Sequence, residues 1–164
     1  MRILLLQHLY LVKKIKVQVL QQQYAHILDS NDISGWPDLF TEQCTYKLQS
    51  RENFDAGHPL CILHLESQAM LRDRVYGVVD TIFHDPYSQR HICSAPLIHS
   101  FNNGLIECES NYLVVRTHSD AMPHVLSVGR YIDKLVMVDS SWKFSQRIAV
   151  FDNDLLPNSV IKPI

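Results

Sequence analysis

The sequence predicts an α+β protein in which N-terminal helices pack in a curved antiparallel sheet. Apolar residues recur at helical spacing through much of the first half, and four long strand-forming segments fill the second half. The dipeptide Asn103-Gly104 separates two of these segments and predicts a β-hairpin, because both residues tolerate positive φ. This order of elements, with helices first and a run of antiparallel strands after them, is typical of an α+β domain. A length of 164 residues suits one domain with one sizeable core.

The first helix is predicted from residue 17 to residue 28. Its apolar positions recur every three or four residues and share one helical face, and they are Val17, Leu20, Tyr24, Ile27 and Leu28. The polar run at 29–32 ends this helix and offers capping residues for the next one. Residues 33–41 then predict a short helix that Pro37 interrupts.

Residues 1–16 are expected to form an N-terminal extension or a frayed helix ahead of a single folded domain at 17–164. The apolar stretch at 3–12 is interrupted by Gln7 and His8, and it is shorter than the about 20 residues that span a bilayer. It also lacks the basic start and the small-residue cleavage site of a signal peptide. We therefore expect a cytoplasmic protein with no membrane partner.

Strands are predicted from residue 44 onward, with one long helix among them. Residues 44–48 alternate in polarity and favour a strand, 51–59 is a polar loop, and 66–83 is a second long helix that Pro86 stops. Four long strands follow as an antiparallel meander, at 92–101, 105–118, 125–138 and 142–151. The tail at 158–164 ends in apolar residues, so we expect it to dock on a surface.

Charge and cysteine content exclude several classes of function. The chain carries 15 Lys and Arg against 17 Asp and Glu, so it shows no basic footprint for nucleic acid. The cysteines are scattered without paired spacing, and reduced thiols are their expected state. The sequence contains no phosphate loop, no dinucleotide fingerprint and no Gly-x-Ser-x-Gly motif.

Metal-ligand patterns occur only as fragments. Cys61 and His64 match half of a Rieske [2Fe–2S] ligand set, but the sequence has no Cys-x-His for the other half. Asp55, His58 and His64 suggest a two-histidine, one-carboxylate iron site, yet a glycine and a proline among them break the helix that such spacing needs. We therefore assign no catalytic, cofactor-binding or metal-binding residue to this chain.

Charged residues in the middle of apolar strands are a more specific feature. Strand alternation places Tyr131 and Asp133 on one face of 128–134 and Arg130 on the other. In the next strand, Arg147 shares its face with apolar residues. Such charges are costly unless they are paired. They predict cross-strand arginine–carboxylate pairs or arginine contacts to a partner chain, with a solvated polar face as the simpler alternative.

Two pairs of motifs give the chain a family resemblance. They are Asp73-Arg74-Val75-Tyr76-Gly77 with Asp85-Pro86-Tyr87-Ser88-Gln89-Arg90-His91, and Val128-Gly129-Arg130-Tyr131-Ile132-Asp133-Lys134 with Gln146-Arg147-Ile148-Ala149-Val150-Phe151-Asp152. With these motifs, residues 17–164 resemble the small (β) subunit of aromatic-ring-hydroxylating, Rieske-type oxygenases. The pattern is most similar to the salicylate hydroxylase, terephthalate and anthranilate systems, whose substrates are hydroxylated or carboxylated aromatics.

The resemblance implies a cystatin-like cone, as in scytalone dehydratase and ketosteroid isomerase. It also implies a non-redox subunit that supports the assembly and stability of a catalytic α subunit, with a β homotrimer inside an α3β3 complex. The Rieske [2Fe–2S] cluster and the mononuclear iron would belong to the α subunit, with no cofactor in this chain. The residues expected at subunit contacts are Arg74, Tyr76, Arg90, Arg130, Asp133 and Arg147.

A different function is compatible with the same cone. A stand-alone isomerase, dehydratase or cyclase would need a carboxylate or histidine in a water-poor pocket, with a hydroxyl group to stabilise an enolate. Asp133, Tyr131 and His91 are the candidates for that role, provided that they converge inside the cone. A ligand-binding module without chemistry is a third interpretation.

Overall fold

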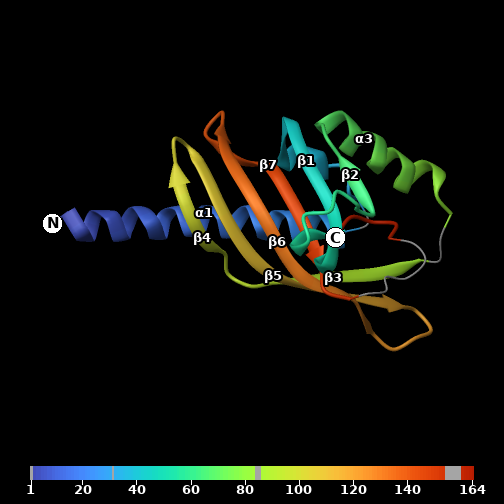
Figure 1. The fold of residues 1–164 in the computed structure, drawn as a ribbon. Coiled ribbons are helices and arrows are strands. Elements are labelled where there is room, and N and C mark those ends of the chain that lie inside the picture. The colour runs from blue at the N-terminus through green and yellow to red at the C-terminus, as the bar shows by residue number, and fades with distance from the viewer. Residues whose placement is uncertain (1, 31, 84–85, 154–159) are drawn as a thin grey trace.

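A curved sheet wraps around one long helix, with shorter helices at one end (Figure 1). The computed structural model describes residues 2–30, 32–83, 86–153 and 160–164. Its helical segments are α1 (Arg2–Asp29), the 3-10 turn η1 (Trp36–Leu39), α2 (Arg51–Asp55), α3 (Gln68–Tyr76) and the π-helical turn η2 (Gly77–Thr81). Its strands are β1 (Phe40–Ser50), β2 (Leu63–Leu65), β3 (Tyr87–Cys93), β4 (Leu97–Asn102), β5 (Leu105–His118), β6 (His124–Val138) and β7 (Ser141–Phe151). The predicted α+β class is confirmed.

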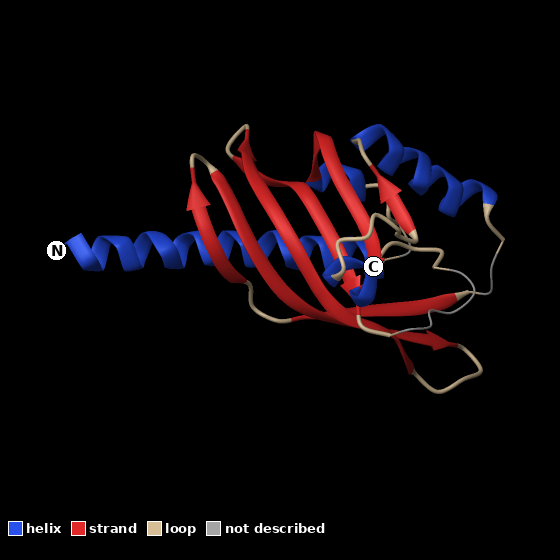
Figure 2. Cartoon of the chain, in the orientation of Figure 1, coloured by secondary structure: helices blue, strands red, loops and turns tan. Residues whose placement is uncertain are grey.

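The strands, drawn as red arrows in Figure 2 and labelled in Figure 1, form a sheet in the order β2-β1-β7-β6-β5-β3, and β4 also pairs with β5. Strands β5, β6 and β7 form an antiparallel meander as predicted, whereas β1 lies parallel to β7. The single strand predicted at 92–101 is wrong, because that segment is divided between β3 and β4. Both pair with β5, and Pro96 lies in the break, where it has no backbone N–H to donate to a ladder.

The segments before β3 need further corrections. The predicted loop at 51–59 begins with α2, which the Ser50 hydroxyl caps by accepting a hydrogen bond from the Asn53 N–H at 3.3 Å. The strand predicted at 44–48 is part of the longer strand β1. The short edge strand β2, which was not predicted from the sequence, pairs with β1. The short helix predicted at 33–41 is reduced to η1. The helix predicted at 66–83 begins later and changes at Gly77 from an α-helix to a π-turn.

The core lies between α1 and the concave face of the sheet. Four residues of the predicted α1 stripe are at most 4% exposed there, namely Val17, Leu20, Tyr24 and Leu28. The Tyr24 ring makes edge-on contacts with Phe40, Tyr131 and Phe144, at centroid distances of 6.4, 5.9 and 5.8 Å. Edge-to-face packing of this kind adds to the apolar area that aromatic side chains bury.

The N-terminal half of α1 extends beyond the β4 side of the sheet (Figure 1). Residues 2–16 continue the same helix as 17–28, and the Lys13 ammonium lies 3.0 Å from the ring centroid of Phe101 on β4. The division into an extension at 1–16 and a domain at 17–164 stays a prediction. Among the described residues, no helix is both long enough and apolar enough to cross a membrane.

Gly129 on β6 lies against the backbone of β7. A Cβ atom at this position would overlap the Val150 carbonyl oxygen and lie 2.9 Å from the Phe151 Cα. The close approach therefore requires glycine at this point of the Gly-Arg-x-x-Asp motif. The predicted turn at Asn103-Gly104 is confirmed, with φ angles of 50° and 80°.

Candidate functional site

Asp133 and Arg147 form a doubly hydrogen-bonded ion pair inside the cone. They lie opposite each other on β6 and β7, and the Arg147 Nε and Nη2 atoms donate to the two Asp133 oxygens at 2.8 and 2.7 Å. Neither side chain has any exposed surface. The Arg147 guanidinium carbon also lies 4.1, 4.1 and 4.0 Å from the ring centroids of Tyr24, Tyr131 and Phe144. These rings give the buried cation further electrostatic stabilisation.

Arg147 keeps its positive charge in the folded chain. Burial by itself would lower the pKa of Arg147, but the Asp133 carboxylate and its hydrogen bonds outweigh burial and raise that pKa above its usual value. The sequence allowed Arg147 a cross-strand pair, a contact to a partner chain or a place on a solvated face, and the structure shows the cross-strand pair. Because neither side chain reaches the surface, we no longer assign a subunit contact to Asp133 or Arg147.

Three of the other residues expected at subunit contacts lie at the surface, and their role there stays a prediction. Tyr76, the last residue of α3, is 63% exposed. Arg90 is exposed on the outer face of β3. The Arg130 side chain, on the outer face of β6, is one third exposed and lies 3.3 Å from Asp55 and 3.8 Å from Glu109.

Arg74 holds the C-terminal tail against α3. Its Nη2 atom donates to the carbonyl oxygens of residues 160 and 161, both at 2.7 Å. Ile164 is fully buried, and its carbonyl oxygen accepts hydrogen bonds from the hydroxyls of Tyr24 at 2.7 Å and Tyr46 at 2.9 Å. The predicted docking of the tail is confirmed over 160–164, while 158–159 lie outside the described residues. The tail therefore occupies the interior of the cone beside the core rings.

Two of the three candidates for acid–base chemistry, Asp133 and His91, are held by a hydrogen-bonded partner, and the third, Tyr131, is kept neutral by burial. Both oxygens of Asp133 accept hydrogen bonds from Arg147. Tyr131 is fully buried, and burial raises the pKa of its hydroxyl well above the usual value, so the phenol is neutral. The His91 Nδ1 lies 2.6 Å from the Asp29 carboxylate at the end of α1, which also accepts the His91 backbone N–H. The Asp29–His91 contact ties α1 to β3 and the Asp133–Arg147 pair joins β6 to β7, so both candidates have structural roles.

The fragments of metal-ligand patterns are dispersed in the fold. Asp55 pairs with Arg130, and the His64 Nε2 lies 3.5 Å from Glu66. Within the part of the chain that the structure describes, no three His, Cys, Asp or Glu side chains are grouped so that they could hold a metal ion. The four cysteines, Cys44, Cys61, Cys93 and Cys108, are free thiols.

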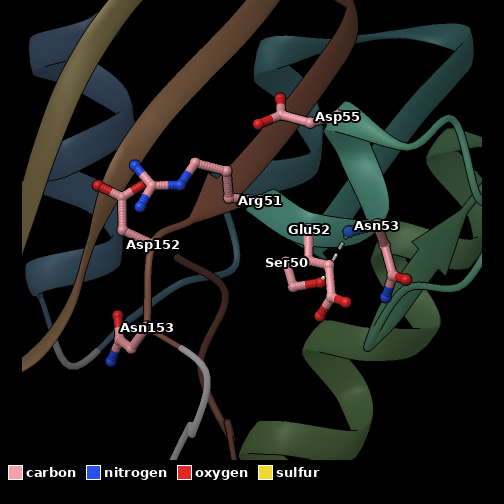
Figure 3. Close-up of a pocket in the computed structure, with 7 residues that line it drawn as sticks. All are labelled: Ser50, Arg51, Glu52, Asn53, Asp55, Asp152 and Asn153. Atoms are coloured by element: carbon pink, nitrogen blue, oxygen red, sulfur yellow. Dashed lines mark hydrogen bonds and ion pairs between the residues drawn. The ribbon is translucent and has the colours of Figure 1, made fainter.

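A polar pocket of about 440 Å³ lies between α2 and the end of β7 (Figure 3). Its lining residues are Ser50, Arg51, Glu52, Asn53, Asp55, Asp152 and Asn153. The Arg51 and Asp152 side chains lie 3.3 Å apart. With three acids and one base, the lining suits a polar or cationic group better than an aromatic ring. Sequence reasoning missed the pocket because it treated 51–59 as a loop, although Ser50 is a typical helix cap.

Comparison with known proteins identifies relatives over nearly the whole chain. A family model described as the ring hydroxylating beta subunit matches residues 23–158. The chain is 33% identical to the anthranilate 1,2-dioxygenase small subunit of Burkholderia cepacia, across 91% of this chain and 92% of that protein. It is 27% identical to a β subunit of the terephthalate 1,2-dioxygenase terminal oxygenase component of Comamonas sp., across 94% of this chain and 100% of that protein.

Solved structures share the fold. A protein assigned as the β subunit of an aromatic-ring-hydroxylating dioxygenase from Novosphingobium aromaticivorans has a TM-score of 0.87 at 24% identity, covering 95% of this chain and 99% of that one. A Nostoc punctiforme protein with a cystatin-like fold has a TM-score of 0.63 at 19% identity, covering 88% and 94%. The predicted cystatin-like cone is confirmed. By its match to the family model, its identity to a curated small subunit and its fold, the chain belongs to the family of ring-hydroxylating oxygenase β subunits.

Proposed function

We propose that this chain is the non-redox small subunit of a multicomponent aromatic-ring-hydroxylating oxygenase, where it supports the assembly and stability of a larger catalytic α subunit. The observation that carries the proposal is the 33% identity over 92% of the anthranilate 1,2-dioxygenase small subunit. The interior of the cone supports it, because the buried ion pair, the neutral Tyr131 and the docked tail occupy the space where a cone enzyme would hold a substrate.

The redox chemistry is assigned to the partner. We expect the Rieske [2Fe–2S] cluster and the mononuclear iron in the α subunit, in a cytoplasmic α3β3 complex with a β homotrimer. The names of the curated relatives give anthranilate and terephthalate as their substrates. We therefore propose an aromatic carboxylate as the substrate class of the complex, bound and oxidised by the α subunit.

Co-expression tests this function. The chain is produced with a large chain from the same organism that carries Cys-x-His and Cys-x-x-His motifs, and the complex is examined by size-exclusion chromatography with light scattering. We expect co-elution at the mass of α3β3, iron in the large chain, and anthranilate turnover only when both chains and an electron donor are present. Iron held tightly by the isolated small chain, or turnover of a small molecule by the small chain alone, would overturn the proposal.

The same complex tests the role of Arg130. Arg130→Ala is expected to weaken co-elution with the large chain, because it removes a partly exposed cation on the outer face of β6. Arg72→Ala is the matched control, since Arg72 is also an exposed arginine in an ion pair, with Asp38 at 2.7 Å, and carries no predicted contact. Equal co-elution of both variants and the wild type would remove Arg130 from the set of contacts.

A further inference from the structure

A short segment at the end of α3 exposes apolar side chains. This segment, residues 76–83, is called the arm here. Tyr76, Val79 and Phe83 are 63%, 57% and 106% exposed, and Ile82 is 37% exposed. Val78 is the only arm side chain that is buried in the domain, at 6% exposure. Apolar side chains gathered at this density on a projecting segment are typical of a protein–protein contact.

A second apolar surface lies on the outer face of the sheet. Its first row is Ile92, Leu113 and Val128, which are paired across β3, β5 and β6, and its second row is Arg90, Val115 and Val125 in the same order. These six residues are called the sheet patch here. Ile92, Val125 and Val128 are 59%, 57% and 40% exposed. On β3 and β5 the two rows are two residues apart, so their side chains share a face. On β6 a register shift pairs Val125 with Val115, three residues from Val128, and both side chains are exposed, so the two rows form one surface.

Each surface carries one charge, and the two charges have opposite signs. Asp80 is exposed on the arm, and Arg90 is exposed within the sheet patch. Among the described residues, neither Asp80 nor Arg90 takes part in an ion pair. A cation at the edge of an apolar surface favours a partner that brings an anion flanked by apolar groups. The arm of this same chain presents that combination.

We propose that the arm of one copy of this chain packs on the sheet patch of a second copy, with Asp80 facing Arg90. The arm projects and the patch is broad, so the contact joins two unlike surfaces. Such a head-to-tail contact repeats from copy to copy and closes a ring when the rotation permits. The inference rests on the proposed function, because it gives the β homotrimer its contact surfaces. It places Tyr76 and Arg90, two of the predicted contact residues, at opposite sides of one interface.

The test uses the small subunit expressed alone and measured by analytical ultracentrifugation. The wild-type chain is expected to associate, and Phe83→Asp and Ile92→Asp are each expected to shift it to monomer. Leu60→Asp is the matched control, because Leu60 is 70% exposed outside both surfaces, and it should leave association unchanged. Circular dichroism establishes that each variant is folded, since all three positions are exposed.

Charge reversal identifies the occupant of each surface. Asp80→Arg and Arg90→Glu are each expected to weaken association on the order of tenfold or more, since like charges then meet. The double variant Asp80→Arg/Arg90→Glu restores the opposite charges at every contact and should recover association. A wild-type chain that stays monomeric, or a double variant no better than the singles, overturns the proposal.

Binding to the large chain separates this inference from the proposed function. If the single variants lose self-association but still bind the large chain, the arm and the patch are surfaces between copies. If the single variants lose the large chain while self-association is unchanged, the arm or the patch contacts the α subunit and the inference fails. If neither the wild-type chain nor any variant binds a large chain, the proposed function fails. The inference is then still tested by the self-association of the small chain.

Discussion

Tyr46 and Ile164 hold each other through two hydrogen bonds. The Tyr46 hydroxyl donates to the Ile164 carbonyl oxygen at 2.9 Å and accepts from the Ile164 N–H at 3.0 Å. Both residues are fully buried. A phenol on β1 thus satisfies the backbone of the tail inside the cone, where water is excluded and an unpaired backbone group would be costly.

Tyr46→Phe is expected to lower the free energy of unfolding by about 1–3 kcal/mol, because it leaves the buried Ile164 N–H without an acceptor. Chemical denaturation measures the change. Tyr10→Phe is the matched control, since Tyr10 is 45% exposed on α1, and it should change stability little. Equal stability of the two variants would show that the tail does not depend on Tyr46.

Arg147→Ala is expected to destabilise the chain by about 3–5 kcal/mol, because it leaves the Asp133 carboxylate buried without its partner. The double variant Arg147→Met/Asp133→Leu removes both charges and retains most of the volume, so it should recover most of that loss. Urea denaturation of the single and double variants gives the comparison. A double variant as unstable as the single would mean that lost packing around the rings, and not the unpaired charge, is the cause.

Gly129→Ala is expected to destabilise the chain by about 3 kcal/mol or more, because the new Cβ meets the backbone of β7, which cannot move without breaking the ladder. Gly35→Ala is the matched control. A Cβ at Gly35 meets only the Ile27 side chain at 3.6 Å, an ordinary contact, so its effect should be small. Thermal unfolding that ranks the two variants in the opposite order would contradict the close approach of β6 and β7.

Alkaline pH is expected to destabilise the chain through its buried tyrosines. Burial raises the pKa of Tyr24 and Tyr131 well above the usual value of 10.0, so the folded state keeps phenolic protons that the unfolded state releases. Their contribution to stability is complete below about pH 10 and is lost as the pH rises further. Urea denaturation between pH 8 and 11 should show this loss, and Tyr131→Phe should flatten it. An unchanged pH dependence in Tyr131→Phe would exclude Tyr131 as a source.

Strand alternation groups the residues of β6 and β7 into two faces but does not say which face is buried. It puts Asp133 with Tyr131 and Arg147 with apolar residues, and the structure buries both of these faces in the cone. It does not give their pairing, because pairing depends on the register between β6 and β7. That register follows from the turn at Asp139 and from an irregularity after Lys134, and neither determines a partner from the sequence alone.

The contact residues show a second limit of sequence reasoning. A charge in an apolar strand has the same pattern whether it pairs within the chain or faces another chain. The pattern therefore does not distinguish Arg147, which is buried, from Arg90, which is exposed. The arm is equally difficult to predict, because Phe83 and Val79 fit the apolar face of a helix and only the fold leaves them outside.

The first and last strands of the sheet are neighbours, and this has a consequence for how the chain folds. Leu48 on β1 lies opposite Ala149 on β7, with all the other strands of the described chain, β2 to β6, between them in the sequence. Joining such distant segments is entropically slow. During synthesis, β1 must therefore wait for the arrival of β7, and until then one backbone edge of β1 has no strand to pair with. A ribosome-bound chain that stops before β7 is expected to be a substrate for chaperones.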